Sequence, residues 1–88
     1  DALPISTING VRTKIQRTHL VDETTTAPAG TVVKKGKHDL WLAAGDGNII
    51  AIDELQPAGK PKMDVTAYLN GHAKFEEGDM VITDEQGK

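Results

Sequence analysis

The dipeptide Asn9-Gly10 stands between two runs of strand-forming residues, and it limits the fold of this chain more than any other feature. Both residues tolerate the positive φ angles of a two-residue hairpin turn, so the flanking runs are predicted to pair as antiparallel strands over residues 5–8 and 11–21. At the strand period of two, one face of the second run carries Val11, Thr13, Ile15, His19 and Val21, and the other carries Arg12, Lys14, Gln16 and Thr18. Arg12 and Lys14 are therefore expected to point together into solvent.

A second hairpin is predicted around Gly45-Asp46-Gly47, which separates the apolar runs 40–44 and 48–52. With Asp46-Gly47 as a two-residue type I′ loop, Ala43 pairs with Ile50 and Trp41 pairs with Ile52. Both faces of this hairpin are apolar, so both must be covered. One face is expected to line a barrel interior, and the other to lie under a helix, a loop or another domain of a longer protein.

The rest of the chain is predicted to form short elements joined by loops. Residues 22–30 and 56–62 are rich in turn-forming residues and are predicted loops, residues 31–35 and 80–83 are predicted strands, and residues 84–88 are a predicted frayed end. The one predicted helix has Asp64 as its N-cap and ends at Gly71, with a hydrophobic staple between Met63 and Tyr68 and an apolar stripe of Val65, Tyr68 and Leu69. The fold class is therefore mainly β, a small antiparallel β-barrel of the oligonucleotide/oligosaccharide-binding (OB) type with one short α-helix.

The length of 88 residues corresponds to one domain, and the chain contains no cysteine. Without cysteine there is no disulfide, zinc knuckle or thiol nucleophile, and so small a core leaves little room for a deep catalytic cleft. No apolar run is long enough to span a bilayer and no signal-peptide pattern begins at residue 1, which predicts a soluble, cytoplasmic protein. Because the sequence lacks an initiator Met, residues 1–88 are expected to be a single domain excised from a longer protein.

The residues that could carry chemistry do not form a recognisable pattern. His19, His38 and His72 lack the i+3 or i+4 spacing of a helical metal chelate, so no metal site is expected. The carboxylates at 53–54 and 76–79 are expected to be solvated, and Ser6 lacks the context of a nucleophile elbow. The sequence therefore predicts no catalytic residue.

The charges are unevenly distributed along the chain. Residues 1–37 carry six basic and three acidic side chains, residues 38–88 carry four and ten, and the net charge is −3. An acidic chain is not expected to bind nucleic acid strongly without specificity, yet a basic face can coexist with an acidic one. Few aromatic residues are present for base stacking, which leaves contact with the nucleic-acid backbone as the mode of binding. The alternative is that the basic side chains are ordinary surface residues with no binding role.

One stretch carries a family resemblance. The run Glu54-Leu55-Gln56-Pro57-Ala58-Gly59-Lys60-Pro61-Lys62-Met63 follows Ala44-Gly45-Asp46-Gly47 and precedes Tyr68-Leu69-Asn70-Gly71-His72 and Gly78-Asp79. In these motifs, residues 4–82 resemble the C-terminal domain of methionyl-tRNA formyltransferase. The resemblance implies a parent enzyme that moves a formyl group from 10-formyltetrahydrofolate to the amino group of methionine on the initiator tRNA. It also implies that the chemistry belongs to an N-terminal Rossmann-like domain, and that this chain is an accessory barrel that helps to hold the tRNA.

The resemblance implies several further expectations. The partners are initiator methionyl-tRNA and the N-terminal formyltransferase domain of the same chain, the domain is a monomer without its own cofactor, and on its own it is inactive. The residues expected to bind tRNA are Arg12, Lys14, Lys34, Lys35, Lys60 and Lys62. Pro61 interrupts the basic run that the family often has here. The alternative is a structural barrel of another folate-dependent formyltransferase, one acting on sugar nucleotides or a formyltetrahydrofolate hydrolase or dehydrogenase, where it would serve interdomain packing.

Overall fold

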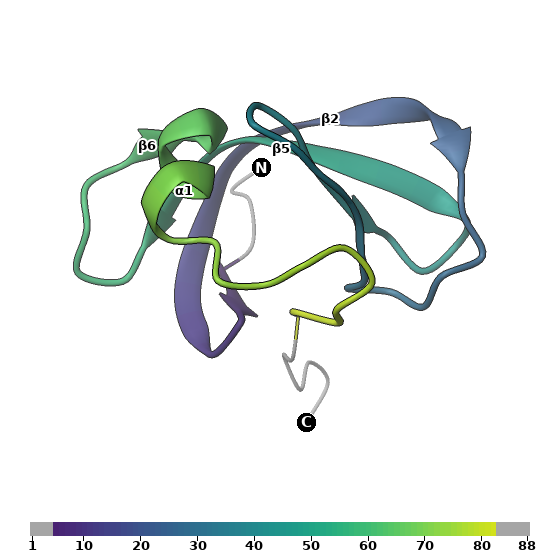
Figure 1. Ribbon diagram of the computed structural model, residues 1–88, viewed down its shortest axis with the longest axis horizontal. Helices are drawn as coiled ribbons and strands as arrows, with labels where there is room; N and C mark the ends of the chain where they lie inside the picture. Colours follow the sequence, from purple (N-terminus) through teal and green to yellow (C-terminus); the bar gives the residue numbers. More distant parts are fainter. Residues whose placement is uncertain (1–4, 83–88) are drawn as a thin grey trace.

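Residues 5–82 are described by a computed structural model, in which most of the chain forms one curled antiparallel sheet (Figure 1). The strands are β1 (Ile5–Ile8), β2 (Val11–Thr24), β3 (Val32–Lys35), β4 (Leu40–Ala43), β5 (Asn48–Pro57) and β6 (Met63–Asp64). They lie in the order β1-β2-β5-β4-β3, with β6 paired to β5. This is a small OB-like fold, mainly β, as predicted.

The first hairpin forms as predicted, with Ile8 opposite Val11 and positive φ angles of 52° at Asn9 and 86° at Gly10. Strand β2 then departs from simple alternation, because its register with β5 shifts on both sides of Arg17. Such a bulge moves the following side chains to the opposite face.

The structure differs from the prediction in the faces of β2, because of this bulge, and also in the length of the strand. Thr18 lines the same apolar groove as Ile15, whereas His19 is exposed and its Nδ1 lies 2.8 Å from Asp53 Oδ2. The prediction that His19 shares a face with Ile15 is therefore wrong. The predicted end of the strand at residue 21 is also wrong, because pairing with β5 continues to Thr24.

The second hairpin has a three-residue loop in place of the predicted two-residue loop. The Ala44 N–H donates to the Asn48 carbonyl at 2.9 Å, and Gly45 and Gly47 have φ angles of 96° and 90°. Ala43 therefore lies opposite Ile49 and Trp41 opposite Ala51, so the predicted register is wrong by one residue. The slip exchanges the faces, and Ile50 and Ile52 join Leu42. Both faces still hold buried side chains, such as Ile52 on one and Ile49 on the other.

The segment 78–82 completes the barrel by bonding to both edges of the sheet. On one side the Asn9 N–H donates to the Val81 carbonyl, and on the other the Val32 N–H donates to the Asp79 carbonyl. The predicted strand 80–83 is thus present only as two isolated bridges, and Thr83 lies outside the described residues, as do Pro4 and residues 84–88. Gly30 is required here, because its φ is +88° and a Cβ would lie 2.9 Å from the Ile82 Cβ.

Helix α1 (Val65–Gly71) closes one end of the barrel. Asp64 Oδ1 accepts a hydrogen bond from the Ala67 N–H at 2.9 Å, which confirms the predicted N-cap. Val65 and Tyr68 are buried in a core that also contains Leu40 and Leu55, and burial raises the pKa of Tyr68 to about 12. Within residues 5–82, no helix is long and apolar enough to cross a membrane.

Candidate nucleic-acid interface

Arg12 and Lys14 lie beside the loop that joins β5 to β6. The Ala58 N–H donates to the Arg12 carbonyl at 2.8 Å, and Lys14 stands opposite Gln56 in the register of β2 and β5. Both cationic side chains are exposed and line a shallow cavity of about 210 Å³ together with Gln56, Pro57, Ala58 and Gly59. The structure therefore joins two basic residues to a loop more than forty positions away along the chain.

Hydrogen bonds fix this loop in a single turn. The Lys60 N–H donates to the Pro57 carbonyl at 3.0 Å, and Gly59 supplies a φ of 79°. The Gln56 side-chain amide donates to the Lys60 carbonyl at 3.0 Å, and it accepts from the Gln16 amide at 3.3 Å. A loop held in this way loses little conformational entropy when a ligand binds to it.

Lys60 is a residue of the same loop and faces a different cavity from Arg12 and Lys14. It lines a second cavity of about 220 Å³ with Asn9, Val11, Tyr68 and His72, while Pro57 and Ala58 border both cavities. The His72 ring stacks on Tyr68 with a centroid distance of 6.0 Å. The loop therefore has Arg12 and Lys14 along one cavity and its own residue Lys60 along the other.

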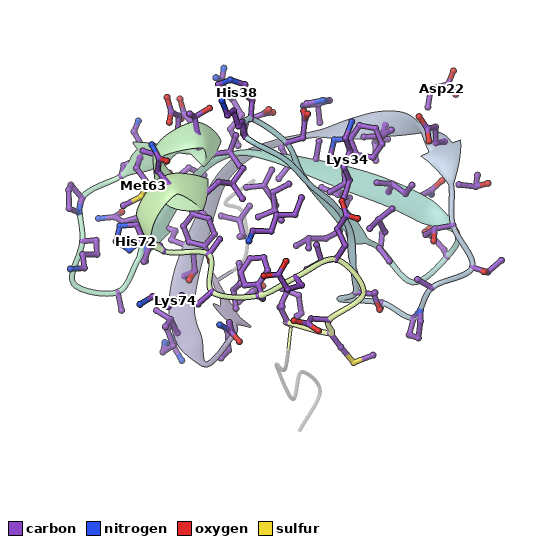
Figure 2. All side chains as sticks on the ribbon, viewed as in Figure 1. Asp22, Lys34, His38, Met63, His72 and Lys74 are labelled. Atoms are coloured by element: carbon purple, nitrogen blue, oxygen red, sulfur yellow. The ribbon has the colours of Figure 1, made fainter. Side chains whose placement is uncertain are left out.

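Lys74 is a further cation at this end of the molecule, and the sequence gave no reason to select it. The Asn9 side-chain amide donates to the Lys74 carbonyl at 3.3 Å, a contact across 65 positions. Figure 2 shows His72 and Lys74 on the side of α1 and the β1–β2 turn, and Asp22 at the opposite end. We call Arg12, Lys14, Lys60 and Lys74 the basic end. No local sequence pattern connects residue 74 to residue 9, so only the fold could identify it.

The other predicted tRNA-binding residues have carboxylate or aromatic neighbours. Lys62 Nζ lies 3.8 Å from Glu54 Oε1, and Glu54 Oε2 in turn lies 3.4 Å from Arg17. Lys34 Nζ lies 3.7 Å from Asp39 Oδ2 and 4.6 Å from the centroid of the Trp41 ring. Among residues 5–82, no carboxylate pairs with the side chains of the basic end.

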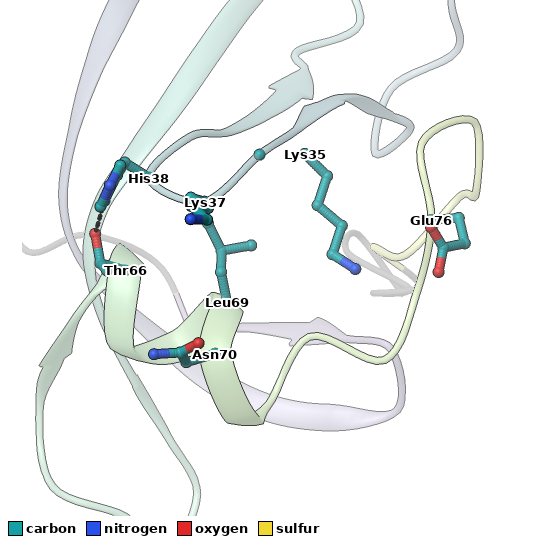
Figure 3. Close-up of a pocket in the computed structure, with 8 residues that line it drawn as sticks. Lys35, Lys37, His38, Thr66, Leu69, Asn70 and Glu76 are labelled. Atoms are coloured by element: carbon teal, nitrogen blue, oxygen red, sulfur yellow. Dashed lines mark hydrogen bonds between the residues drawn. The ribbon is translucent and has the colours of Figure 1, made fainter.

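Lys35 belongs to a separate cavity of about 540 Å³ between the β3–β4 turn and α1 (Figure 3). Lys37 and His38 also line it, and His38 Nδ1 lies 2.9 Å from the Thr66 hydroxyl. Glu76 contributes a carboxylate to the same cavity, and the Lys35 N–H donates to Glu77 Oε2 at 2.9 Å. The predicted set of six residues is thus divided. Arg12, Lys14 and Lys60 lie at the basic end, Lys34 and Lys35 lie in a mixed-charge group around β3, and Lys62 lies beside Glu54.

The carboxylates and histidines do not form a metal centre in the part of the chain that the structure describes. No three His, Asp or Glu side chains there are placed to hold a metal ion. His19 pairs with Asp53, and both side chains are solvent-accessible, with exposed fractions of 61% and 29%.

Comparison with known proteins identifies the family. The model of the family described as "Formyl transferase, C-terminal domain" matches residues 4–73. This chain belongs to that family. The match contains Arg12, Lys14 and Lys60, while Lys74 lies one position beyond it. Three of the four residues of the basic end therefore lie in the region that matches the family.

Three similar proteins are named methionyl-tRNA formyltransferase. The one from Pediococcus pentosaceus is 45% identical over 92% of this chain and 26% of its own length. Those from Lactiplantibacillus plantarum and Latilactobacillus sakei subsp. sakei are 54% and 51% identical over 85% and 76% of this chain, and 24% and 21% of their own lengths. The chain therefore spans about a quarter of the length of these relatives.

Proposed function

We propose that this chain is the C-terminal domain of a methionyl-tRNA formyltransferase and that its basic end binds the sugar-phosphate backbone of the initiator tRNA. The names of its relatives support the enzyme. One structural observation supports the RNA contact. Arg12 and Lys14 lie beside a hydrogen-bonded loop that carries Lys60, and within residues 5–82 none of these three cations pairs with a carboxylate. Unpaired cations on a fixed frame can meet phosphates without first breaking an ion pair.

The aromatic residues favour backbone contact over base stacking. The chain has one Trp, one Tyr and one Phe. Tyr68 and Phe75 are buried, and Lys34 lies over the Trp41 ring. Base stacking needs an exposed aromatic face, so phosphate contacts remain as the source of affinity. Binding of this kind is mostly counterion release, with a Kd of about 10⁻⁴ to 10⁻⁶ M at physiological salt.

The formyl transfer is assigned to the part of the parent protein outside this chain. We propose that 10-formyltetrahydrofolate binds to an N-terminal catalytic domain, and that the 88-residue chain alone transfers no formyl group. In this proposal the chain is a single accessory domain of a monomeric, cytoplasmic enzyme of translation initiation. The runner-up function is a purely structural barrel, which has no need of unpaired cations around a fixed loop.

The test compares two charge reversals of equal size in the full-length enzyme. Lys14→Glu combined with Lys60→Glu is expected to raise the KM for initiator tRNA at least about tenfold with little change in kcat, because binding shared by ground and transition states is lost. The matched control is Lys34→Glu combined with Lys37→Glu, which makes the same charge change around β3. It is expected to change KM less than about threefold. Equal effects of the two pairs, or an effect only of the control pair, would contradict RNA binding at the basic end.

A further inference from the structure

The end of the barrel opposite α1 is open and apolar. A groove of about 330 Å³ continues the barrel interior there, lined mainly by Ile15, Leu42, Ile50, Ile52 and Ile82. Leu42 and Ile52 belong to the buried core, whereas Ile50 and Ile82 are only partly buried against it. The helix that covers the other end has no counterpart here among residues 5–82.

Leu20 extends this apolar lining along β2. It lies opposite Ile50 in the register of β2 and β5, so the two side chains share a face of the sheet, and Thr18 and Ile52 share that face next to them. Leu20 is 71% exposed, more than either of the other exposed large apolar residues, Val11 and Met80. An exposed leucine beside an open apolar groove indicates a surface that binds another apolar group.

The charges around the groove disfavour RNA as its occupant. Asp22 and Glu23 follow Leu20 on β2 and are exposed, and the Thr25 N–H donates to the Gly47 carbonyl, which brings Asp46 to the same end. Three carboxylates at one end repel phosphates. A polypeptide segment with an apolar side chain fits this surface better than a nucleic acid.

The course of the chain favours one such polypeptide. Ser6 of β1 and Ile82 both line the groove, so both ends of the described chain reach its mouth. The family is described as a C-terminal domain, and the relatives are about four times as long as their aligned parts. The preceding polypeptide of the full-length protein would therefore enter beside the groove.

We propose that the groove is a docking site for an apolar segment of the polypeptide that precedes this domain, packed among Ile15, Ile50 and Leu20. The proposal rests on the part of the proposed function that places this chain after a catalytic domain, and not on RNA binding. It assigns the two ends of the barrel to two partners, RNA at the basic end and the parent protein at the groove.

The first test measures thiol reactivity in the full-length enzyme without RNA. Because this chain has no cysteine, Leu20→Cys and Met80→Cys each introduce its sole thiol. In this domain Leu20 is 71% exposed and Met80 is 54% exposed, so without docking the first thiol reacts with N-ethylmaleimide at least as fast as the second. Docking reverses this order. The thiol from Leu20→Cys is then expected to react at least about tenfold more slowly than the thiol from Met80→Cys, as followed by peptide mass spectrometry. Equal or faster reaction at position 20 overturns the proposal.

The second test identifies the occupant. A benzophenone amino acid at position 20 of the full-length enzyme is expected to cross-link to a peptide from the same molecule that precedes this domain, whereas the same probe at position 80 is not. Cross-linking only to a second copy, or protection at position 20 that needs added tRNA, overturns the proposal. The enzyme with Lys14→Glu and Lys60→Glu is expected to keep the protection, so failure of docking and failure of RNA binding are separable.

Discussion

Strand β2 connects two ends of the molecule that differ in charge, polarity and closure. At its start, Arg12 and Lys14 lie near a helix that seals the barrel, beside a loop fixed by hydrogen bonds. Towards its far end, Thr18 lines an open apolar groove, and the exposed residues Leu20, Asp22 and Glu23 follow it along the strand. The bulge around Arg17 lies between them and exchanges the faces of the strand. A chain with a net charge of −3 can thus present exposed cations at one end, because within residues 5–82 no carboxylate pairs with the side chains of the basic end.

The largest expected effect concerns the sealed end. Tyr68→Ala removes a side chain that is 3% exposed from the core beneath α1 and is expected to lower the free energy of unfolding by about 3–5 kcal/mol. Leu20→Ala at the open end is expected to change it by no more than about 0.5 kcal/mol. Urea unfolding followed by the fluorescence of Trp41 measures both.

The phenol of Tyr68 adds a dependence on pH that checks its burial. Its pKa is raised from 10.0 to about 12 in the folded chain, so the stability it contributes is complete below pH 10 and is lost as the pH rises toward 12. Tyr68→Phe keeps the ring and removes this titration, so it is expected to lose less stability across that range. A similar loss in both proteins would mean that the phenol is solvated.

A smaller effect separates two glycines that share a backbone conformation. Gly30 and Gly10 have φ angles of 88° and 86°, but only at Gly30 does an added Cβ meet Ile82, at 2.9 Å. Gly30→Ala is expected to cost about 1–3 kcal/mol of stability, and Gly10→Ala about 1 kcal/mol from backbone strain alone. Equal costs in urea unfolding would show that the closing segment yields freely to the methyl group.

The smallest expected effect distinguishes Lys60, which has no ion pair among residues 5–82, from Lys62, which has one. Lys60→Ala is expected to reduce the slope of log affinity for tRNA against log salt by about 1, since one phosphate contact is lost. Lys62→Ala is expected to change the slope by less than about half as much, because Lys62 lies 3.8 Å from Glu54. Titrations at several salt concentrations measure both slopes, and a larger change for Lys62→Ala would assign the contact to the wrong lysine.

Local signals in the sequence predicted most of the elements. Asn9-Gly10 gave the first hairpin, and Asp64 gave the start of α1, because turn geometry and capping depend on neighbouring residues. The register of β4 and β5 was missed, since Gly45 adopts a positive φ and adds a third residue to the loop. The bulge at Arg17 was missed because the curvature of the whole sheet, and not the local sequence, determines where a strand must bend.

The candidate site was only partly predictable for a related reason. Its cations were visible as residue types, but their grouping depends on pairing between β2 and β5. That pairing joins Arg12 to the 57–60 loop and leaves Lys34 and Lys35 around β3, next to carboxylates. Lys74 joins the basic end only through the turn at Asn9. The number of charges along a sequence does not show which residues far apart in that sequence lie side by side.

The way segment 78–82 closes the barrel also determines when the domain can become functional during its synthesis. Val81 bonds to Asn9 and Gly30, residues that leave the ribosome long before it does, and Ile82 forms part of the groove wall. The barrel and the groove are therefore completed in the same late step of translation. In the docking that we propose, a segment encoded earlier in the message can pack into the groove only after this step.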